Sequence, residues 1–148
     1  MLTQTLNTIF TRDLTKLQQE IGAYTTDDAM WVVDKGVTNS GGNLCLHLLG
    51  NINTYICVVI GNCGYVRNRP LEFTETGITK ADLLQRIAAT IAVVNAAFTQ
   101  LNEEDLPKEY PILVFEQPMT YEFFLVHLAA HLSYHLGQIN YHRRLLDV

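Results

Sequence analysis

The sequence predicts an all-α protein of 148 residues, built as a four-helix bundle. Four segments carry apolar residues at intervals of three and four, which is the spacing of one helical face. The chain has no internal repeat, no low-complexity tract and no internal domain boundary. Helices of this kind bury their apolar faces by packing on one another, so residues 1–148 are expected to form a single domain.

The first predicted helix covers residues 3–22 and ends at Gly22, a residue type that commonly terminates helices. Its apolar positions are Leu6, Ile9, Phe10, Leu14, Leu17 and Ile21. A long polar connection, residues 23–42, follows. Trp31 in this connection is expected to pack against the core, because an exposed indole would leave a large apolar area in water.

The second predicted helix starts at Asn43, is capped by Ser40 or Asn43, and ends near Gly61. Apolar residues occupy almost every side of it, so the helix is expected to be buried. His47, Asn51 and Thr54 form a polar stripe within it. Buried polar groups need hydrogen-bond partners, so this stripe marks a place where other polar residues should converge.

A second loop, residues 62–78, precedes a third helix that Thr79 caps and that extends to Leu101. Residues 110–118 are apolar and bounded by prolines, which suits an extended segment or an edge ribbon. Thr120 caps the fourth helix. Its apolar positions are Phe124, Leu128, Leu132, Leu136 and Ile139.

The composition excludes several classes of protein. A formal net charge of −5, with no basic cluster longer than Arg143-Arg144, argues against binding to nucleic acid or to an anionic membrane. The first residues do not resemble a signal peptide, and no apolar run is long enough to span a membrane. The odd number of cysteines (Cys45, Cys57 and Cys63) predicts free thiols in a reducing cytosol, hence a soluble cytoplasmic protein.

The fourth helix contains His127, His131 and His135 at intervals of four residues. Side chains four residues apart are neighbours on one helical face, so either adjacent pair can offer two imidazoles to one metal ion. A further ligand must come from elsewhere, because three ligands from one straight helix have poor geometry. The other histidines are His47 and His142.

Three stretches carry a resemblance to a known family: Asn43–Asn51, Arg67–Phe73 and His131–Gln138. Together they resemble the DinB/YfiT-like family of metal-dependent enzymes, and the order of helices and loops is similar over nearly the whole chain. The resemblance implies an up-down-down-up bundle with long loops after the first and second helices. It also implies a divalent metal ion, most often nickel or zinc, bound by His47, His131 and His135.

Members of that family tend to be homodimers, and the resemblance implies the same here. Characterised members include thiol S-transferases that use bacillithiol or mycothiol, and a mycothiol-dependent isomerase. This chain looks closest to a short, uncharacterised branch, so the identity of the substrate does not carry over. The implied partners are a small-molecule substrate and, for a transferase, a thiol cofactor.

Four residues near the predicted ligands have two interpretations each. Asn51 either orients a ligand or substrate or is a satisfied buried amide. His127 either supports a metal ligand from behind or is a packing residue. Gln138 either supports a ligand or, as the preferred reading, hydrogen-bonds across helices. Tyr134 is a candidate acid or substrate-binding phenol, although tyrosines on bundle helices more often pack.

The remaining candidates favour structural roles. Arg67 and Arg69 lie in a loop that is expected to be solvated, with the binding of an anionic substrate tail as the alternative. His142 near the helix end is expected to interact with the helix dipole. Cys45 points away from His47 by about 200°, which makes it a poor fourth ligand.

The acidic residues limit the reaction. The second helix has no carboxylate after Asn43, and the fourth has only Glu122 and Asp147, near its ends. A general base would therefore come from a loop, a histidine or the substrate. The sequence thus predicts a metal-dependent enzyme that activates water or a low-molecular-weight thiol. The alternatives are a non-catalytic metal- or ligand-binding bundle and a metal-free dimeric interaction domain.

Overall fold

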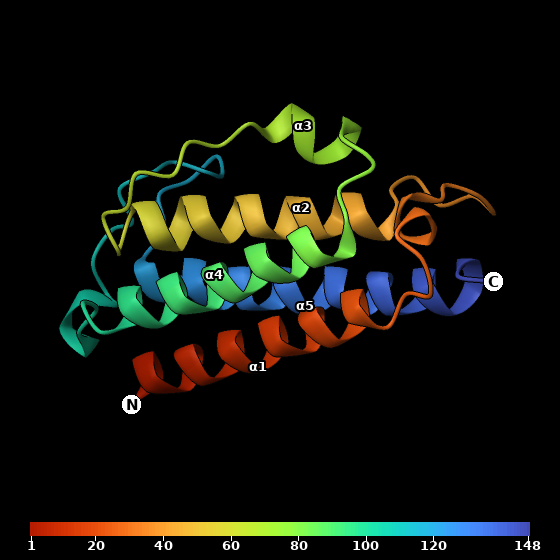
Figure 1. Cartoon of the computed structure of the whole chain (residues 1–148). Helices are drawn as coiled ribbons and strands as arrows, with labels where there is room; N and C mark the ends of the chain where they lie inside the picture. The colour runs from red at the N-terminus through yellow and green to blue at the C-terminus, as the bar shows by residue number, and fades with distance from the viewer.

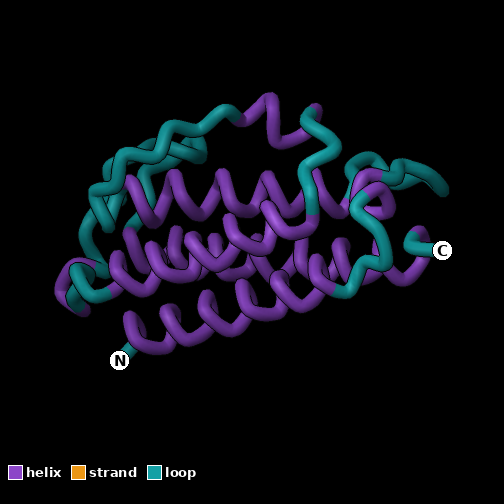
Figure 2. The backbone as a smooth tube through the Cα atoms, viewed as in Figure 1, coloured by secondary structure: helices purple, strands orange, loops and turns teal.

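The computed structural model describes all 148 residues as helices and connections, without a strand (Figure 2). The body consists of four long helices: α1 (Leu2–Gly22), α2 (Gly41–Ile52), α4 (Lys80–Phe98) and α5 (Tyr121–Leu146). The short elements are η1 (Asp28–Trp31), the π-helical η2 (Asn53–Val58), α3 (Arg69–Thr74) and η3 (Glu103–Asp105). The predicted four-helix bundle is confirmed.

The helices α1 and α5 run in one direction and α2 and α4 in the other, which is the predicted up-down-down-up order (Figure 1). Since α2 and α4 point the same way, the chain must return along the whole bundle between them. Residues 59–79 make this return, and α3 lies over α2 within it (Figure 1). The long second connection is therefore a requirement of the topology.

The core lies between the four long helices. Fully buried side chains from all of them meet in one cluster, which includes Leu14, Leu48, Ile87 and Leu132. The helix α2 contributes most completely, because every one of its twelve residues is buried. Its polar residues His47 and Asn51 are therefore held inside the protein, as the sequence predicts.

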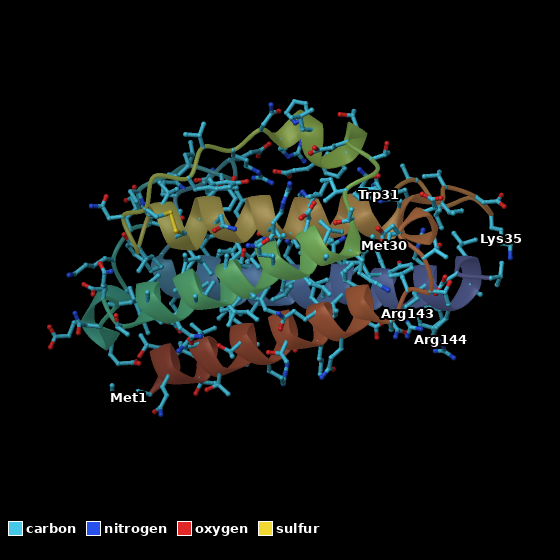
Figure 3. The ribbon with its side chains drawn as sticks, viewed as in Figure 1. Met1, Met30, Trp31, Lys35, Arg143 and Arg144 are labelled. Carbon is cyan, nitrogen blue, oxygen red and sulfur yellow. A yellow bond between two sulfur atoms is a disulfide. The ribbon has the colours of Figure 1, made fainter.

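Side chains at the start of α2 confirm two expectations. The backbone N–H of Asn43 donates to Oγ of Ser40 over 3.1 Å, so Ser40 is the cap. Trp31 is half-buried and packs against the core near the start of α2 (Figure 3), and its indole N–H donates to the carbonyl of Ile78 over 3.2 Å. The hydrogen bond from Trp31 to Ile78 joins the first connection to the second.

The structure differs from the expected elements at three places. Regular α-helix ends at Ile52 and continues as the π-helical η2, so the long predicted helix has two parts. The helix α3 was not predicted, because six residues are too few for a periodic pattern. Residues 110–118 contain no strand, and one isolated bridge joins Glu109 to Thr120 at their base.

The prediction of three free thiols is wrong for two of them. Cys57 and Cys63 form a disulfide, drawn as the yellow bond in Figure 3, whereas Cys45 is free and buried. The turn after η2 brings their Cα atoms to 5.5 Å, which lies within the range that a disulfide requires. The cysteines therefore no longer support a reducing compartment, and the cytoplasmic location stays a prediction.

The helix α4 is the one element whose length and apolar composition would suit a membrane span. Core helices of soluble proteins meet the same criterion. Leu83, Ile87 and Val94 of α4 are buried in the bundle core, and 33% of its apolar window is buried in all.

His142, which was expected to interact with the helix dipole, also belongs to a buried hydrogen-bond network. Its side chain is buried, Tyr24 O–H donates to its Nδ1 over 2.7 Å, and its Nε2–H donates to the carbonyl of Val32 over 2.8 Å. His142 therefore ties α5 to the first connection.

We expect Leu17→Ala to lower the free energy of unfolding by about 2–5 kcal/mol, since it leaves a cavity in the core. Leu17 is fully buried, whereas Leu113 in a loop is 65% exposed and serves as the control position. Leu113→Ala should change stability by no more than about 0.5 kcal/mol. Urea unfolding of both variants measures the difference, and equal stabilities would contradict the described core.

Candidate metal centre

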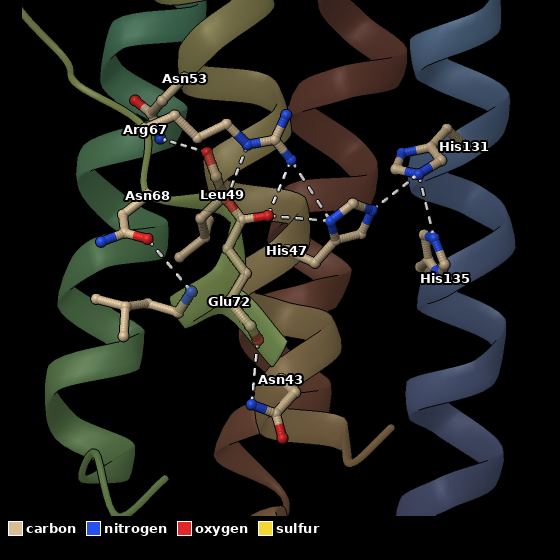
Figure 4. Close-up of polar contacts among 10 residues, drawn as sticks. Asn43, His47, Leu49, Asn53, Arg67, Asn68, Glu72, His131 and His135 are labelled. Carbon is tan, nitrogen blue, oxygen red and sulfur yellow. Dashed lines mark hydrogen bonds and ion pairs between the residues drawn. The ribbon is translucent and has the colours of Figure 1, made fainter. Parts of the chain in front are cut away.

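Three histidines meet between α2 and α5, as Figure 4 shows. His47 comes from α2, and His131 and His135 come from adjacent turns of α5. Nε2 of His131 lies 3.2 Å from Nε2 of His47 and 3.1 Å from Nε2 of His135. The ligand atoms of all three lie within 4.8 Å of one another. The sequence predicted this meeting, although the three positions are up to 88 residues apart.

The spacing of these nitrogen atoms fits a metal ion. Zinc–imidazole bonds measure about 2.0–2.1 Å, so two such ligands at 90° to 110° stand about 2.9–3.4 Å apart. Both short Nε2–Nε2 distances, 3.2 and 3.1 Å, fall in that interval. One cation could therefore contact His131 together with either His47 or His135, and the ligand atom of the third histidine lies within 4.8 Å of the other two.

Hydrogen bonds on the far side of two rings determine which nitrogen faces the centre. Nδ1 of His47 donates to Oε1 of Glu72 over 3.1 Å, and Nδ1 of His135 donates to Oε1 of Gln138 over 2.6 Å. Both rings, when neutral, therefore turn an Nε2 lone pair toward Nε2 of His131. Nε2 of His131 carries at most one hydrogen, so it can donate to only one of these two lone pairs. Its Nδ1 is buried and has no partner. A cation would satisfy all the lone pairs.

The surroundings keep His131 and His47 neutral. Burial, together with repulsion from His135 and His47, lowers the pKa of His131 to about 4. Burial also lowers the pKa of His47, although its hydrogen bond to Glu72 opposes the shift. Metal ligands must be deprotonated, so both rings are ready to bind a cation at neutral pH.

Glu72 is a site residue that the sequence pattern did not reveal. Its carboxylate is buried beside His47 and accepts from Nε and Nη2 of Arg67 over 2.8 and 2.9 Å (Figure 4). Arg67 is thus paired inside the protein and not solvated as expected. The only signal in the sequence was the resemblance of Arg67–Phe73 to a family motif, because α3 itself was unrecognised.

Two features of α2 let the Glu72 side chain come close to this helix. A Cβ atom at Gly50 would collide with the Glu72 carboxylate, so glycine is required for this close contact. The side-chain amide of Asn43 donates to the carbonyls of Glu72 and Glu75 over 3.1 and 2.7 Å, which anchors α3. Carboxylates that hold metal-binding histidines in this manner raise ligand basicity and fix ring orientation.

The other predicted neighbours have different positions. Gln138 contacts His135 within α5, so the preferred reading of a bond across helices is wrong. The amide oxygen of Asn51 is buried and has no partner, so this residue is not a satisfied buried amide. His127 packs between Phe115 and Phe124. Tyr134 is 65% exposed, and its hydroxyl accepts from Nε2 of Gln138 over 3.3 Å.

Two cavities adjoin the histidines. One, of about 320 Å³, is lined by His47 and His131. The other, of about 600 Å³, is lined by His135 together with residues 35–39 and part of α5. No carboxylate lines either cavity, so neither contains an acidic general base.

Comparison with known proteins identifies an uncharacterised family. A family model described as "Protein of unknown function (DUF1572)" matches residues 3–147. The chain is also similar to a structure described as "Crystal structure of the conserved protein of locus from Enterococcus faecalis", with a TM-score of 0.77 and 18% identity. That match covers 99% of this chain and 97% of the other, and at this identity it shows a shared fold alone. The comparison with curated proteins gave no match.

We expect Glu72→Gln to weaken zinc binding by about 10- to 100-fold, because His47 would lose its charged acceptor. Competition with a chromophoric chelator measures the dissociation constant, and circular dichroism verifies folding. Unchanged affinity in a folded variant would show that Glu72 does not support the site.

A change at Gly50 tests the same contact without altering a charge. Gly50→Ala should displace Glu72 and weaken zinc binding in the same direction. Gly22→Ala is the matched control, since a Cβ there meets only an ordinary contact at 3.9 Å. Equal zinc affinities for the two alanine variants would contradict the role assigned to this close approach.

Proposed function

We propose that this chain, which belongs to the DUF1572 family of proteins of unknown function, is a divalent-metal-dependent enzyme of the DinB type. Its metal ligands would be His47, His131 and His135. The observation that carries the proposal is the convergence of three Nε2 atoms, two of them directed by hydrogen bonds at Nδ1. Imidazole donors suit both nickel and zinc, which are the proposed cofactors.

The chemistry follows from an incomplete ligand set. When bound, a divalent ion with three imidazole ligands can lower the pKa of water toward about 7 or hold a thiol as thiolate. Glu72 and Gln138 keep the His47 and His135 rings in the required tautomer. The neutral state of His131 and His47 keeps protons from competing for the ligand atoms.

The two cavities favour transfer between two reactants over plain hydrolysis. A thiol and an electrophile need separate spaces beside the centre, and cavities of about 600 and 320 Å³ adjoin different histidines. Hydrolysis usually requires a general base beside the attacking water. Neither cavity has a carboxylate in its lining, whereas attack by a thiolate needs no such base.

The absence of a carboxylate from both cavity linings also favours a second candidate function, which is binding without catalysis. In a non-catalytic bundle, the ion would join α2 to α5 and the cavities would bind a small molecule without turnover. Turnover of a thiol with an electrophile by the metal-loaded protein separates the two functions.

We also propose that the protein forms a homodimer through α5. An apolar stripe on its outer face includes the exposed residues Phe123, Val126, Tyr134 and Tyr141. Exposed small residues, Ala130 and Gly137, lie within the stripe and would let two helices approach closely. A solvated helix normally keeps such a face polar, so a second copy of the chain is the proposed cover.

Elemental analysis of protein purified without a polyhistidine tag tests the metal centre. We expect about one nickel or zinc ion per wild-type chain and a loss of metal in His135→Ala, which removes one of three ligands. His127→Phe is the control, because it removes a histidine of the same helix but keeps an aromatic ring for packing.

The control should retain the wild-type metal content. If wild-type protein were metal-free and took up neither zinc nor nickel at micromolar concentrations, the metal centre would be excluded. The third alternative, a metal-free interaction domain, would then account for the histidines as core residues.

Val126→Asp tests the dimer. A charge in the middle of the stripe would be buried without a partner at the interface, so the variant should sediment as a monomer where the wild type sediments as a dimer. Val66→Asp is the control, since Val66 is 87% exposed on the second connection. A monomeric wild type, or equal dimerisation of both variants, would contradict an interface on α5.

A further inference from the structure

The smaller cavity is called here the arginine chamber. Its lining has an apolar part and a polar part. It lies between α2, α5 and two connections. Its apolar lining consists of Val114, Phe115, Phe124 and Leu128, and its polar lining includes Asn51, Arg67 and Arg69 beside His47 and His131. A ligand that fits this lining has an apolar body and a polar part.

One of the two arginine charges of the chamber is uncompensated. Arg67 is neutralised by Glu72 through two hydrogen bonds, but Arg69 forms no ion pair with any carboxylate. Its guanidinium carbon lies 5.3 Å from the centre of the Phe73 ring, which is its only specific contact. With no acid in the lining, the chamber is positive overall.

A second observation points to a missing polar ligand. The side chain of Asn51 lines the chamber, the residue is only 8% exposed, and its amide oxygen has no hydrogen-bond partner. Nδ1 of His131 is likewise buried without a partner. Buried polar groups almost always have partners, so the unpaired amide oxygen indicates that a bound molecule supplies a hydrogen-bond donor. Arg69 lines the same chamber and is exposed, so its guanidinium is free to bind an anionic group of that molecule.

We propose that the arginine chamber binds a small carboxylate with an apolar or aromatic body, and that this class contains the substrate of the metal centre. The inference rests on the proposed function, because it places the substrate beside His47 and His131. The carboxylate accepts hydrogen bonds from the Arg69 guanidinium, and a hydroxyl or N–H group elsewhere on the ligand donates to the amide oxygen of Asn51. The apolar body packs on Phe115 and Phe124.

The binding of 4-fluorobenzoate, followed by ¹⁹F NMR, tests this assignment on zinc-loaded protein. The neutral isostere 4-fluorobenzamide has the same body without the charge. A hydrogen-bonded ionic contact is worth about a tenfold change in the dissociation constant or more, so the acid should bind at least about tenfold more tightly than the amide.

Two arginine variants form a matched pair. Arg69→Gln should weaken binding of the acid about tenfold and leave the amide unchanged. Arg144→Gln is the control, because Arg144 is also exposed and unpaired, with its guanidinium carbon 5.4 Å from the ring centre of Tyr141, away from the chamber.

Two results would overturn the proposal: equal affinities of wild-type protein for acid and amide, or equal affinities of Arg69→Gln and Arg144→Gln for the acid. The second result would show that the carboxylate binds the metal alone. Zinc content is measured on every sample, which keeps the two hypotheses apart. Loss of zinc from wild-type protein contradicts the metal centre, whereas a zinc-replete protein without acid preference contradicts the chamber.

Discussion

The buried carboxylate of Glu72 is the constraint around which the site is arranged. An ionised carboxylate in the interior is costly unless charge and hydrogen bonds compensate it. Arg67 supplies the charge and two hydrogen bonds, and His47 supplies a third. The same contacts that make the carboxylate tolerable also hold the His47 ring with its Nε2 toward α5.

This arrangement depends on the topology of the bundle. Because α2 and α4 run in the same direction, the chain between them must pass back along the molecule, and that return passes over α2 with α3 (Figure 1). It contains both Arg67 and Glu72, which contact each other beside His47 (Figure 4). The absence of a side chain at Gly50 then lets the carboxylate reach the helix. A connection required for chain reversal thus supplies both the support of one ligand and the cationic lining of the arginine chamber.

The fold was largely predictable, because amphipathic spacing, caps and glycines are local features. The four long helices lie close to the predicted ranges, and Ser40, Thr79 and Thr120 all act as caps. The short α3 and the π-helical η2 were missed, since six residues give no usable periodicity. The disulfide between Cys57 and Cys63 was also missed, because an odd number of cysteines suggests free thiols but does not require them.

By itself the sequence determined the helical bundle, the buried polar stripe on α2 and the four-residue spacing that places His131 and His135 on one face. All of these follow from periodicity within single helices. Only the tertiary structure decided that Glu72 holds His47, that Gln138 holds His135 and that Asn51 and Arg69 face a chamber without partners. Most of these relations join residues that are distant in sequence, and even the contact between Gln138 and His135 depends on how their side chains are oriented within the packed bundle.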